Sequence, residues 1–166
     1  MNLLKPTHIG ILLSICFIYS GATMADTPSN TGVIILRDKD NAICTLPMPA
    51  PGKLEYFELS KHGQGSCAPN TARSIQLAEV SSATIINLWD YPRCQNTADD
   101  EFRIGLRTTQ KKTSTPIIEI EYITTFKEGV IVTPGLLLTR KYVRHGGTAR
   151  DNLDCIVVQT SHLPSP

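Results

Sequence analysis

Apolar and polar residues alternate along most of this chain. In residues 102–107 the apolar Phe, Ile and Leu alternate with Arg, Gly and Arg, so an extended backbone carries the two kinds on opposite faces. Ile75 and Leu77 flank Gln76 in the same way. A repeat of two residues is typical of strands with one buried face, and no segment has the apolar spacing of an amphipathic helix. The pattern therefore predicts an all-β fold.

About ten short strands follow from this pattern. They cover residues 33–37, 42–46, 54–59, 74–80, 84–90, 102–107, 118–122, 130–133, 136–143 and 155–159. Turn-forming residues separate them, and we interpret residues 81–83 as a tight connection, residues 108–116 as a polar loop and residues 127–129 as a hairpin turn. Many short strands at this spacing indicate a sandwich or a barrel.

The first residues have a different pattern. Lys5 and His8 precede an apolar run at residues 9–19, and mostly small residues follow up to Ala25. This three-part layout is typical of a secretory signal peptide that is cleaved after Ala25. The apolar run is shorter than the roughly 20 residues that span a bilayer. We therefore expect a secreted or periplasmic protein without integral membrane association in its mature form.

The rest of the chain has the length of one domain. We expect a flexible N-terminus at residues 26–32, a single β domain at residues 33–160 and a tail at residues 161–166. Lys5 is the only charged residue among residues 1–25, so the excess of 16 basic over 15 acidic side chains becomes an even balance after cleavage. A neutral protein has no overall field that attracts nucleic acid, so no nucleic-acid partner is expected.

The cysteines indicate disulfides. Removal of Cys16 with the signal peptide leaves Cys44, Cys67, Cys94 and Cys155. Because these four lack the spacing of metal ligands, we interpret them as structural pairs in an oxidising compartment. Four cysteines allow three pairings. We favour Cys44–Cys67 with Cys94–Cys155, since segments that are close in sequence are often close in space.

A basic segment lies near the end of the chain. Arg140, Lys141 and Arg144 surround Tyr142, and Arg150 follows. We take Arg140, Lys141 and Arg144 as candidate binding residues for an acidic partner. The favoured interpretation of this segment, however, is a solvated strand edge whose charges prevent pairing with other chains.

Trp89 and Tyr91 are the aromatic candidates. We favour a place in the core for both, and a pair of binding aromatics is the alternative. Residues 99–101, Asp-Asp-Glu, offer oxygen ligands to a cation, but a charged turn before a strand explains them as well. We expect neither a metal site nor a cofactor.

An enzyme would need a nucleophile and a base. Residues 144–146, Arg-His-Gly, match the triplet that opens the active site of histidine phosphatases, where the histidine accepts the phosphoryl group. That triplet belongs near the start of an α/β domain, so we interpret His145 as part of an exposed turn. The chain has no Gly-x-Ser-x-Gly motif. A hydrolase site built from dispersed residues would depend on His62 and His145.

One segment carries a family resemblance. Gly63 follows Tyr56 by seven residues, and residues 70–75 are Asn-Thr-Ala-Arg-Ser-Ile. Residues 54–92 resemble in this respect the βγ-crystallin type of Greek-key motif, in which the glycine permits a folded hairpin beneath the aromatic ring. The resemblance implies a Greek-key fold. It also implies calcium at the element that contains Asn70, but further oxygen ligands are missing there, so calcium is not expected.

The expected function is binding without catalysis. Export, cysteines without a metal pattern, a neutral charge and the lack of a catalytic motif favour a protein that acts on a protein partner, as an inhibitor or an accessory subunit. Some secreted relatives of the crystallin type look like enzyme inhibitors, which agrees with this expectation. The alternatives are a secreted hydrolase or toxin, and a carbohydrate-binding or adhesive module that exposes Trp89 or Tyr91.

Overall fold

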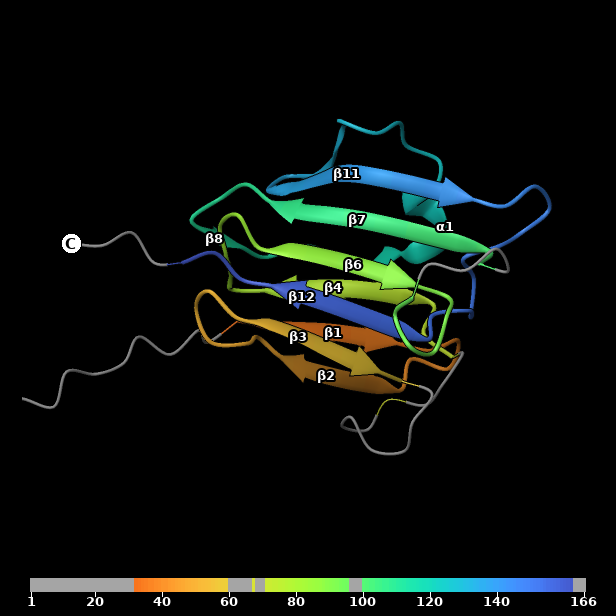
Figure 1. The fold of residues 1–166 in the computed structure, drawn as a ribbon, viewed down its shortest axis with the longest axis horizontal. Helices are drawn as coiled ribbons and strands as arrows, with labels where there is room; N and C mark the ends of the chain where they lie inside the picture. The colour runs from red at the N-terminus through yellow and green to blue at the C-terminus, as the bar shows by residue number, and fades with distance from the viewer. Residues whose placement is uncertain (1–31, 60–66, 68–70, 96–99, 163–166) are drawn as a thin grey trace, which may run out of the picture.

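The computed structural model describes residues 32–59, 67, 71–95 and 100–162. Within these residues, the strands form three sheets, and one short helix lies between β9 and β10 in the sequence (Figure 1). The four-stranded sheet has the order β2-β1-β4-β9, the six-stranded sheet has the order β10-β11-β7-β6-β12-β3, and β5 pairs with β8. The bounds are β1 Val33–Arg37, β2 Ile43–Pro47, β3 Leu54–Glu58, β4 Ser74–Ala78, β5 Val80–Ser81, β6 Ile85–Trp89, β7 Phe102–Thr108, β8 Lys112–Thr113, β9 Ile118–Glu119, α1 Ile120–Ile123, β10 Ile131–Thr133, β11 Leu136–Val143 and β12 Cys155–Gln159.

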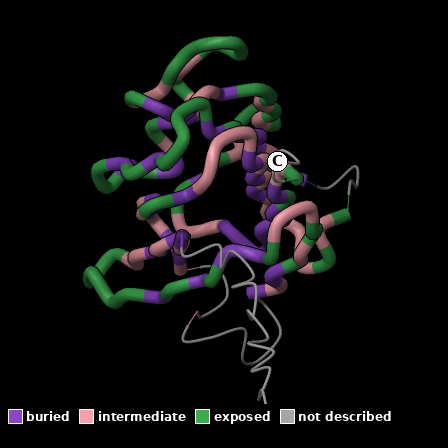
Figure 2. Tube along the Cα trace, turned by 90° about the vertical axis from the view of Figure 1, so that its left-hand side faces the viewer, coloured by how far each residue is buried: buried purple, intermediate pink, exposed green. Residues whose placement is uncertain are grey.

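The two larger sheets lie face to face, with β1, β2 and β4 behind β3, β12 and β6 in Figure 1. Buried and more exposed residues alternate along the strands, as Figure 2 shows. β1 buries Ile34 and Leu36, and β7 buries Phe102, Ile104 and Leu106. These side chains belong to one hydrophobic cluster between the sheets. The predicted all-β fold is confirmed as a sandwich, while the Greek-key connectivity stays a prediction.

The segment predicted as one strand at residues 74–80 is divided between two sheets. Glu79 has a φ of 57°, which ends β4 and redirects β5. β5 then pairs with β8, where Val80 lies opposite Thr113. The predicted polar loop at residues 108–116 therefore contains a strand. Its polar side chains hold it in place, since Ser114 accepts a hydrogen bond from the Glu79 N–H at 3.0 Å.

The predicted strand at residues 118–122 was wrong beyond Glu119, because the chain turns there into α1. Ile120 and Ile123 are both fully buried, a spacing of one helical turn. Tyr122 is 56% exposed and packs edge-on against Phe126 at 5.1 Å between ring centroids. The alternation of Ile and Glu fits an extended strand up to residue 120, and the burial of Ile123 in place of Tyr122 breaks it.

The hairpin turn predicted at residues 127–129 is not a hairpin. Residues 128 and 129 do form a turn, but this turn does not join two strands. Gly129 has a φ of 82° and donates its N–H to the carbonyl of Leu138 at 2.8 Å. It connects α1 to β10. The hairpin between β10 and β11 turns instead at Pro134 and Gly135, where the φ of Gly135 is 86°, a value that favours glycine.

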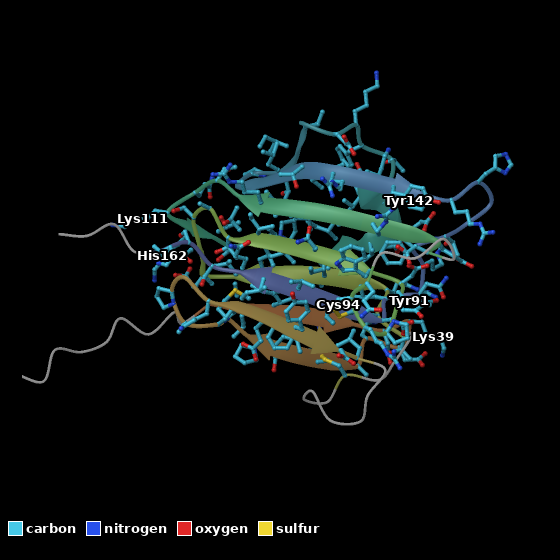
Figure 3. The ribbon with its side chains drawn as sticks, in the orientation of Figure 1. Lys39, Tyr91, Cys94, Lys111, Tyr142 and His162 are labelled. Atoms are coloured by element: carbon cyan, nitrogen blue, oxygen red, sulfur yellow. A yellow bond between two sulfur atoms is a disulfide. The ribbon has the colours of Figure 1, made fainter. Side chains whose placement is uncertain are left out.

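The two ends of the described chain are held by the domain. Gly32 is buried and accepts a hydrogen bond from the Met48 N–H at 3.1 Å. Ser161 donates its hydroxyl to the Ser82 carbonyl at 3.0 Å. His162 lies at the same end of the sandwich as Lys111 (Figure 3). The predicted signal peptide lies outside the described residues. No helix in the described part of the chain is long and apolar enough to cross a membrane.

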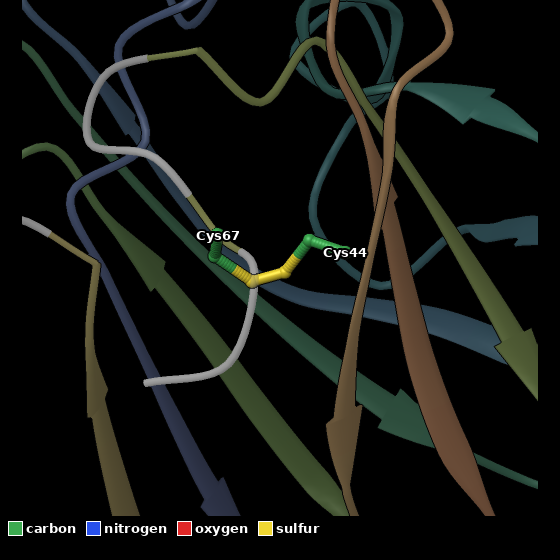
Figure 4. Close-up of a disulfide and its surroundings, with 2 residues drawn as sticks. All are labelled: Cys44 and Cys67. Carbon is green, nitrogen blue, oxygen red and sulfur yellow. A yellow bond between two sulfur atoms is a disulfide. The ribbon is translucent and has the colours of Figure 1, made fainter. Parts of the chain in front are cut away.

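Both favoured disulfides are present. Cys44 in β2 is bonded to Cys67, with a Cα–Cα distance of 5.0 Å (Figure 4). Cys94 is bonded to Cys155 in β12, with a Cα–Cα distance of 5.3 Å. The first bond ties the edge strand β2 to a segment that follows β3. The second ties the turn after β6 to the strand that lies beside β6 in the sheet.

Candidate functional site

The outer face of the six-stranded sheet points away from the four-stranded sheet. The outward side chains of β6, β7 and β11 form three rows across the strands. The rows are Trp89, Arg103 and Tyr142; then Asn87, Gly105 and Arg140; then Ile85, Arg107 and Leu137. We call these residues, together with Thr139, the arginine–aromatic face.

A bulge in β11 decides which side chains reach this face. Leu138 pairs with Leu106, whereas Arg140 pairs with Gly105, so Thr139 is an extra residue in β11. Without the extra residue, Arg140 would point inward as Leu138 does, and Lys141 would point outward. The bulge reverses this order and places Arg140 on the outer face.

Arg103 lies between two aromatic rings. Its guanidinium carbon is 4.7 Å from the ring centroid of Tyr142 and 5.7 Å from that of Trp89. Both distances are within the range of cation–π attraction. Asp100 also holds the Arg103 side chain in place, since the Asp100 Oδ2 lies 3.2 Å from the Arg103 Nε. The Asp100 side chain is fully buried. The three side chains therefore form a stack that is held in place before any ligand arrives.

Gly105 lies at the centre of the arginine–aromatic face. A Cβ at this position would lie 2.9 Å from the Thr139 Oγ1, 3.1 Å from the Asn87 Oδ1 and 3.3 Å from the Arg140 Cβ. The missing side chain therefore lets three neighbours converge over the backbone of β7. Two of these neighbours bring hydrogen-bonding groups to the middle of the face.

The structure brings only some of the predicted binding residues together. Trp89 and Arg140 lie on the arginine–aromatic face. Lys141 points to the other side of the sheet, where its Nζ donates to the carbonyls of Thr124 at 2.7 Å and Phe126 at 2.6 Å. It therefore holds the segment after α1, and its selection as a binding residue is not supported by its position.

The other predicted cations also lie apart from the face. Arg144 is exposed beyond the end of β11, and its N–H donates to the Glu101 carbonyl at 2.7 Å. Arg150 belongs to the following loop and faces Glu119 of the four-stranded sheet at 3.8 Å. The basic segment of the sequence is therefore not one patch in space.

The favoured core position of Trp89 and Tyr91 is wrong. Both are half-buried and neither belongs to the hydrophobic cluster between the sheets. Trp89 is the last residue of β6. Tyr91 lies past the end of β6 near Cys94 (Figure 3). Trp89 directly follows the buried Leu88, so the alternation along β6 places its ring on the outer face.

Sequence reasoning missed Arg103 and Arg107 as site residues. Their signal was present, because both alternate with buried apolar residues in β7. The alternation alone predicts that they share a face. It does not predict that β6 and β11 are the neighbours of β7, and this pairing is what brings Trp89 and Tyr142 beside Arg103.

Two carboxyl groups lie behind Trp89. Burial first, and the charge of Asp90 second, raise the pKa of Asp154 to about 6. Burial also raises the pKa of Asp90, against the hydrogen bond that its carboxylate accepts from the Glu101 N–H. The Asp154 side chain is only 6% exposed, and its backbone N–H donates to the Trp89 carbonyl at 2.9 Å. We therefore expect the charge of this pair, at the end of β6, to depend on pH above the range of ordinary aspartates.

The candidate catalytic residues are not assembled into a site that the structure describes. His145 is exposed in a turn with Gly146, as the sequence predicted for it. His62 and Asp99 lie outside the described residues. Asp100 is buried beneath Arg103, while Glu101 accepts a hydrogen bond from the Asn152 Nδ2 at 2.8 Å.

The described ranges contain no metal site. Among these residues, no cluster of three or more His, Cys, Asp and Glu side chains is placed to hold a metal ion. No protein-family model matches the chain, and neither a curated protein nor a solved structure matches it.

Proposed function

We propose that the protein is a secreted or periplasmic binding protein that acts without catalysis, by docking a protein partner on the arginine–aromatic face. Two disulfides agree with an oxidising compartment. The observation that carries the proposal is the stack of Arg103 between Trp89 and Tyr142. Arg, Trp and Tyr are the residues that most often dominate the binding energy of protein interfaces.

The stack also favours a protein over a sugar as the occupant. A carbohydrate module presents free aromatic faces for stacking, but the Arg103 guanidinium already lies against the rings of Trp89 and Tyr142. Because Asp100 holds Arg103 in this position, little side-chain freedom is lost when a partner binds. Such a rigid surface is consistent with the role of an inhibitor and with that of an accessory subunit.

A capture experiment tests the proposal. The wild-type protein and a Tyr142→Ala variant are immobilised and exposed to the native extracellular fraction. We expect the wild type to retain a partner in stoichiometric amount and Tyr142→Ala to lose it, since the variant removes one side of the stack. The matched control is Tyr122→Ala, which removes an exposed tyrosine from α1.

The proposal fails if no partner is retained by the wild type, or if the Tyr122→Ala variant loses the partner while Tyr142→Ala keeps it. Circular dichroism of each variant establishes that the fold is intact before capture is compared.

A further inference from the structure

We infer that the partner presents an acidic segment to the arginine–aromatic face, whose Asp or Glu carboxylates pair with Arg107 and Arg140. This inference rests on the proposed function and names the chemistry of the partner. It concerns the two arginines of the face that do not take part in the aromatic stack.

The charged side chains of this face are all positive. The outward positions of the described strands β6, β7 and β11 contain three arginines and no Asp or Glu. Arg103 is neutralised from below by Asp100. Arg107 and Arg140 are exposed, and neither forms an ion pair with another residue in the described part of the chain. Since the chain is close to neutral overall, the positive charge of this face is a local feature that complements an acidic partner.

The spacing of the two arginines fits an extended acidic segment. Arg140 lies opposite Gly105, two residues along β7 from Arg107, so the two are diagonal neighbours about 7–8 Å apart. In an extended peptide, side chains on one face recur about every 7 Å. Alternate carboxylates of such a peptide can therefore meet both guanidiniums, and each guanidinium can bind a carboxylate through two parallel hydrogen bonds.

The surroundings of the arginines support the same ligand. The hydroxyl of Thr139 and the amide of Asn87 lie over Gly105, in the same part of the face as Arg140, and can supply hydrogen bonds to a peptide backbone. A shallow hollow beside Arg107, which Ser82, Thr109 and Leu137 help to line, leaves room for a side chain at the end of the face. An acidic peptide therefore meets charge, hydrogen-bonding groups and space together.

Trp89 is the only tryptophan of the chain, so its fluorescence reports on this face directly. The disulfide-bonded protein is titrated at low salt with a synthetic peptide in which Glu alternates with Ser, and with the same peptide in which Gln replaces Glu. Polygalacturonate serves as a carboxylate polymer that is not a peptide. We expect a saturable change with the Glu peptide alone, which weakens as salt is added.

Charge reversal provides the decisive comparison. The double variant Arg107→Glu with Arg140→Glu should weaken binding of the Glu peptide by about tenfold or more, because it replaces two attractions with repulsions. The control is Arg150→Glu, which reverses an exposed arginine outside the face and should leave the affinity within about twofold.

The inference is overturned if the Glu peptide gives no saturable change, if the double variant binds it as the wild type does, or if polygalacturonate binds in its place. Its failure is distinguishable from that of the proposed function. A captured partner that is lost with Tyr142→Ala but kept by the Arg107→Glu, Arg140→Glu variant would leave the binding function standing and remove the acidic segment.

Discussion

Arg103 serves the fold and the candidate site at the same time. Its Nε pairs with the buried Asp100, and its guanidinium lies against the rings of Trp89 and Tyr142. A buried carboxylate needs a partner, because an unpaired charge is costly in the protein interior. The need of Asp100 for a partner therefore also fixes the position of the Arg103 side chain on the surface. One ion pair thus orders the central arginine of the arginine–aromatic face.

The raised pKa of Asp154 predicts that stability depends on pH, and it predicts the sign of this dependence. The pKa of this carboxyl is raised to about 6 in the folded protein, from an ordinary value of 3.8. The folded state therefore binds more protons than the unfolded state between these values, and the free energy of unfolding falls as pH rises through this window. We expect Asp154→Asn to reduce this fall and to be more stable than the wild type at pH 7 by about 3 kcal/mol.

Urea denaturation at a series of pH values measures this effect. Asp40→Asn is the control, since Asp40 is exposed beside Lys39 at the surface. Part of the slope should remain in Asp154→Asn, because the pKa of Asp90 is also raised. An unchanged slope in Asp154→Asn would contradict the assignment.

At the scale of elements, the alternation of residues predicted most strands, but it predicted the side that each residue faces only where the alternation is unbroken. β7 follows a strict repeat of two, so its arginines and its buried residues could be placed from the sequence. β11 does not, because the bulge at Thr139 exchanges the sides of Arg140 and Lys141. Such a bulge depends on the pairing with Gly105, which is a contact between distant residues and leaves no local signal.

The short elements were beyond prediction for a related reason. β8 has two residues and a polar composition, and it forms only because β5 lies beside it. α1 has one turn, and packing rather than helix propensity stabilises a helix of that length. Its clearest local signal is the pair Thr124 and Thr125, whose hydroxyls donate to the carbonyls of Glu121 at 2.7 Å and Tyr122 at 2.8 Å.

Lys141 should behave as a structural residue of α1 and its following turn. Lys141→Met keeps the length of the side chain but removes the donor to the carbonyls of Thr124 and Phe126. We expect the free energy of unfolding to fall by about 2 kcal/mol, the range of hydrogen bonds to a charged group. Arg140→Met is the neighbouring control and should change stability by less than about 0.5 kcal/mol.

Urea denaturation compares these two variants, and capture of the partner separates their roles. Lys141→Met should retain the partner when folded, whereas Arg140→Met should weaken it. Equal losses of stability would show that the inward position of Lys141 contributes nothing to the fold.

For the molecule as a whole, the two disulfides close loops of different length. The paired cysteines are 23 residues apart in Cys44–Cys67 and 61 apart in Cys94–Cys155. Loop entropy in the unfolded chain then gives a contribution of about 3 kcal/mol for the first and about 4 kcal/mol for the second. The sequence predicted this pairing from proximity along the chain, and the sheet order explains it, because β12 lies directly beside β6.

Replacement of each pair by serine separates their effects. Cys94→Ser with Cys155→Ser should lower stability more than Cys44→Ser with Cys67→Ser does. It should also change the fluorescence of Trp89, since Cys155 lies directly opposite Trp89 across the strands. Cys44→Ser with Cys67→Ser should lower stability and leave that fluorescence as it is. Thermal unfolding and emission spectra provide the two measurements. A change of emission in the second variant alone would contradict the placement of Trp89.

The position of β12 has a consequence for how the chain reaches this state. β12 lies between β6 and β3, and within the described residues it is the only strand partner of β3. As the chain is synthesised, β3 emerges early and must wait for a strand from the far end of the domain. Folding through such distant pairing is slow and leaves apolar strands exposed meanwhile. Leu54, Tyr56 and Phe57 of β3 are thus the residues that a folding helper, or a neighbouring unfolded copy, would meet first.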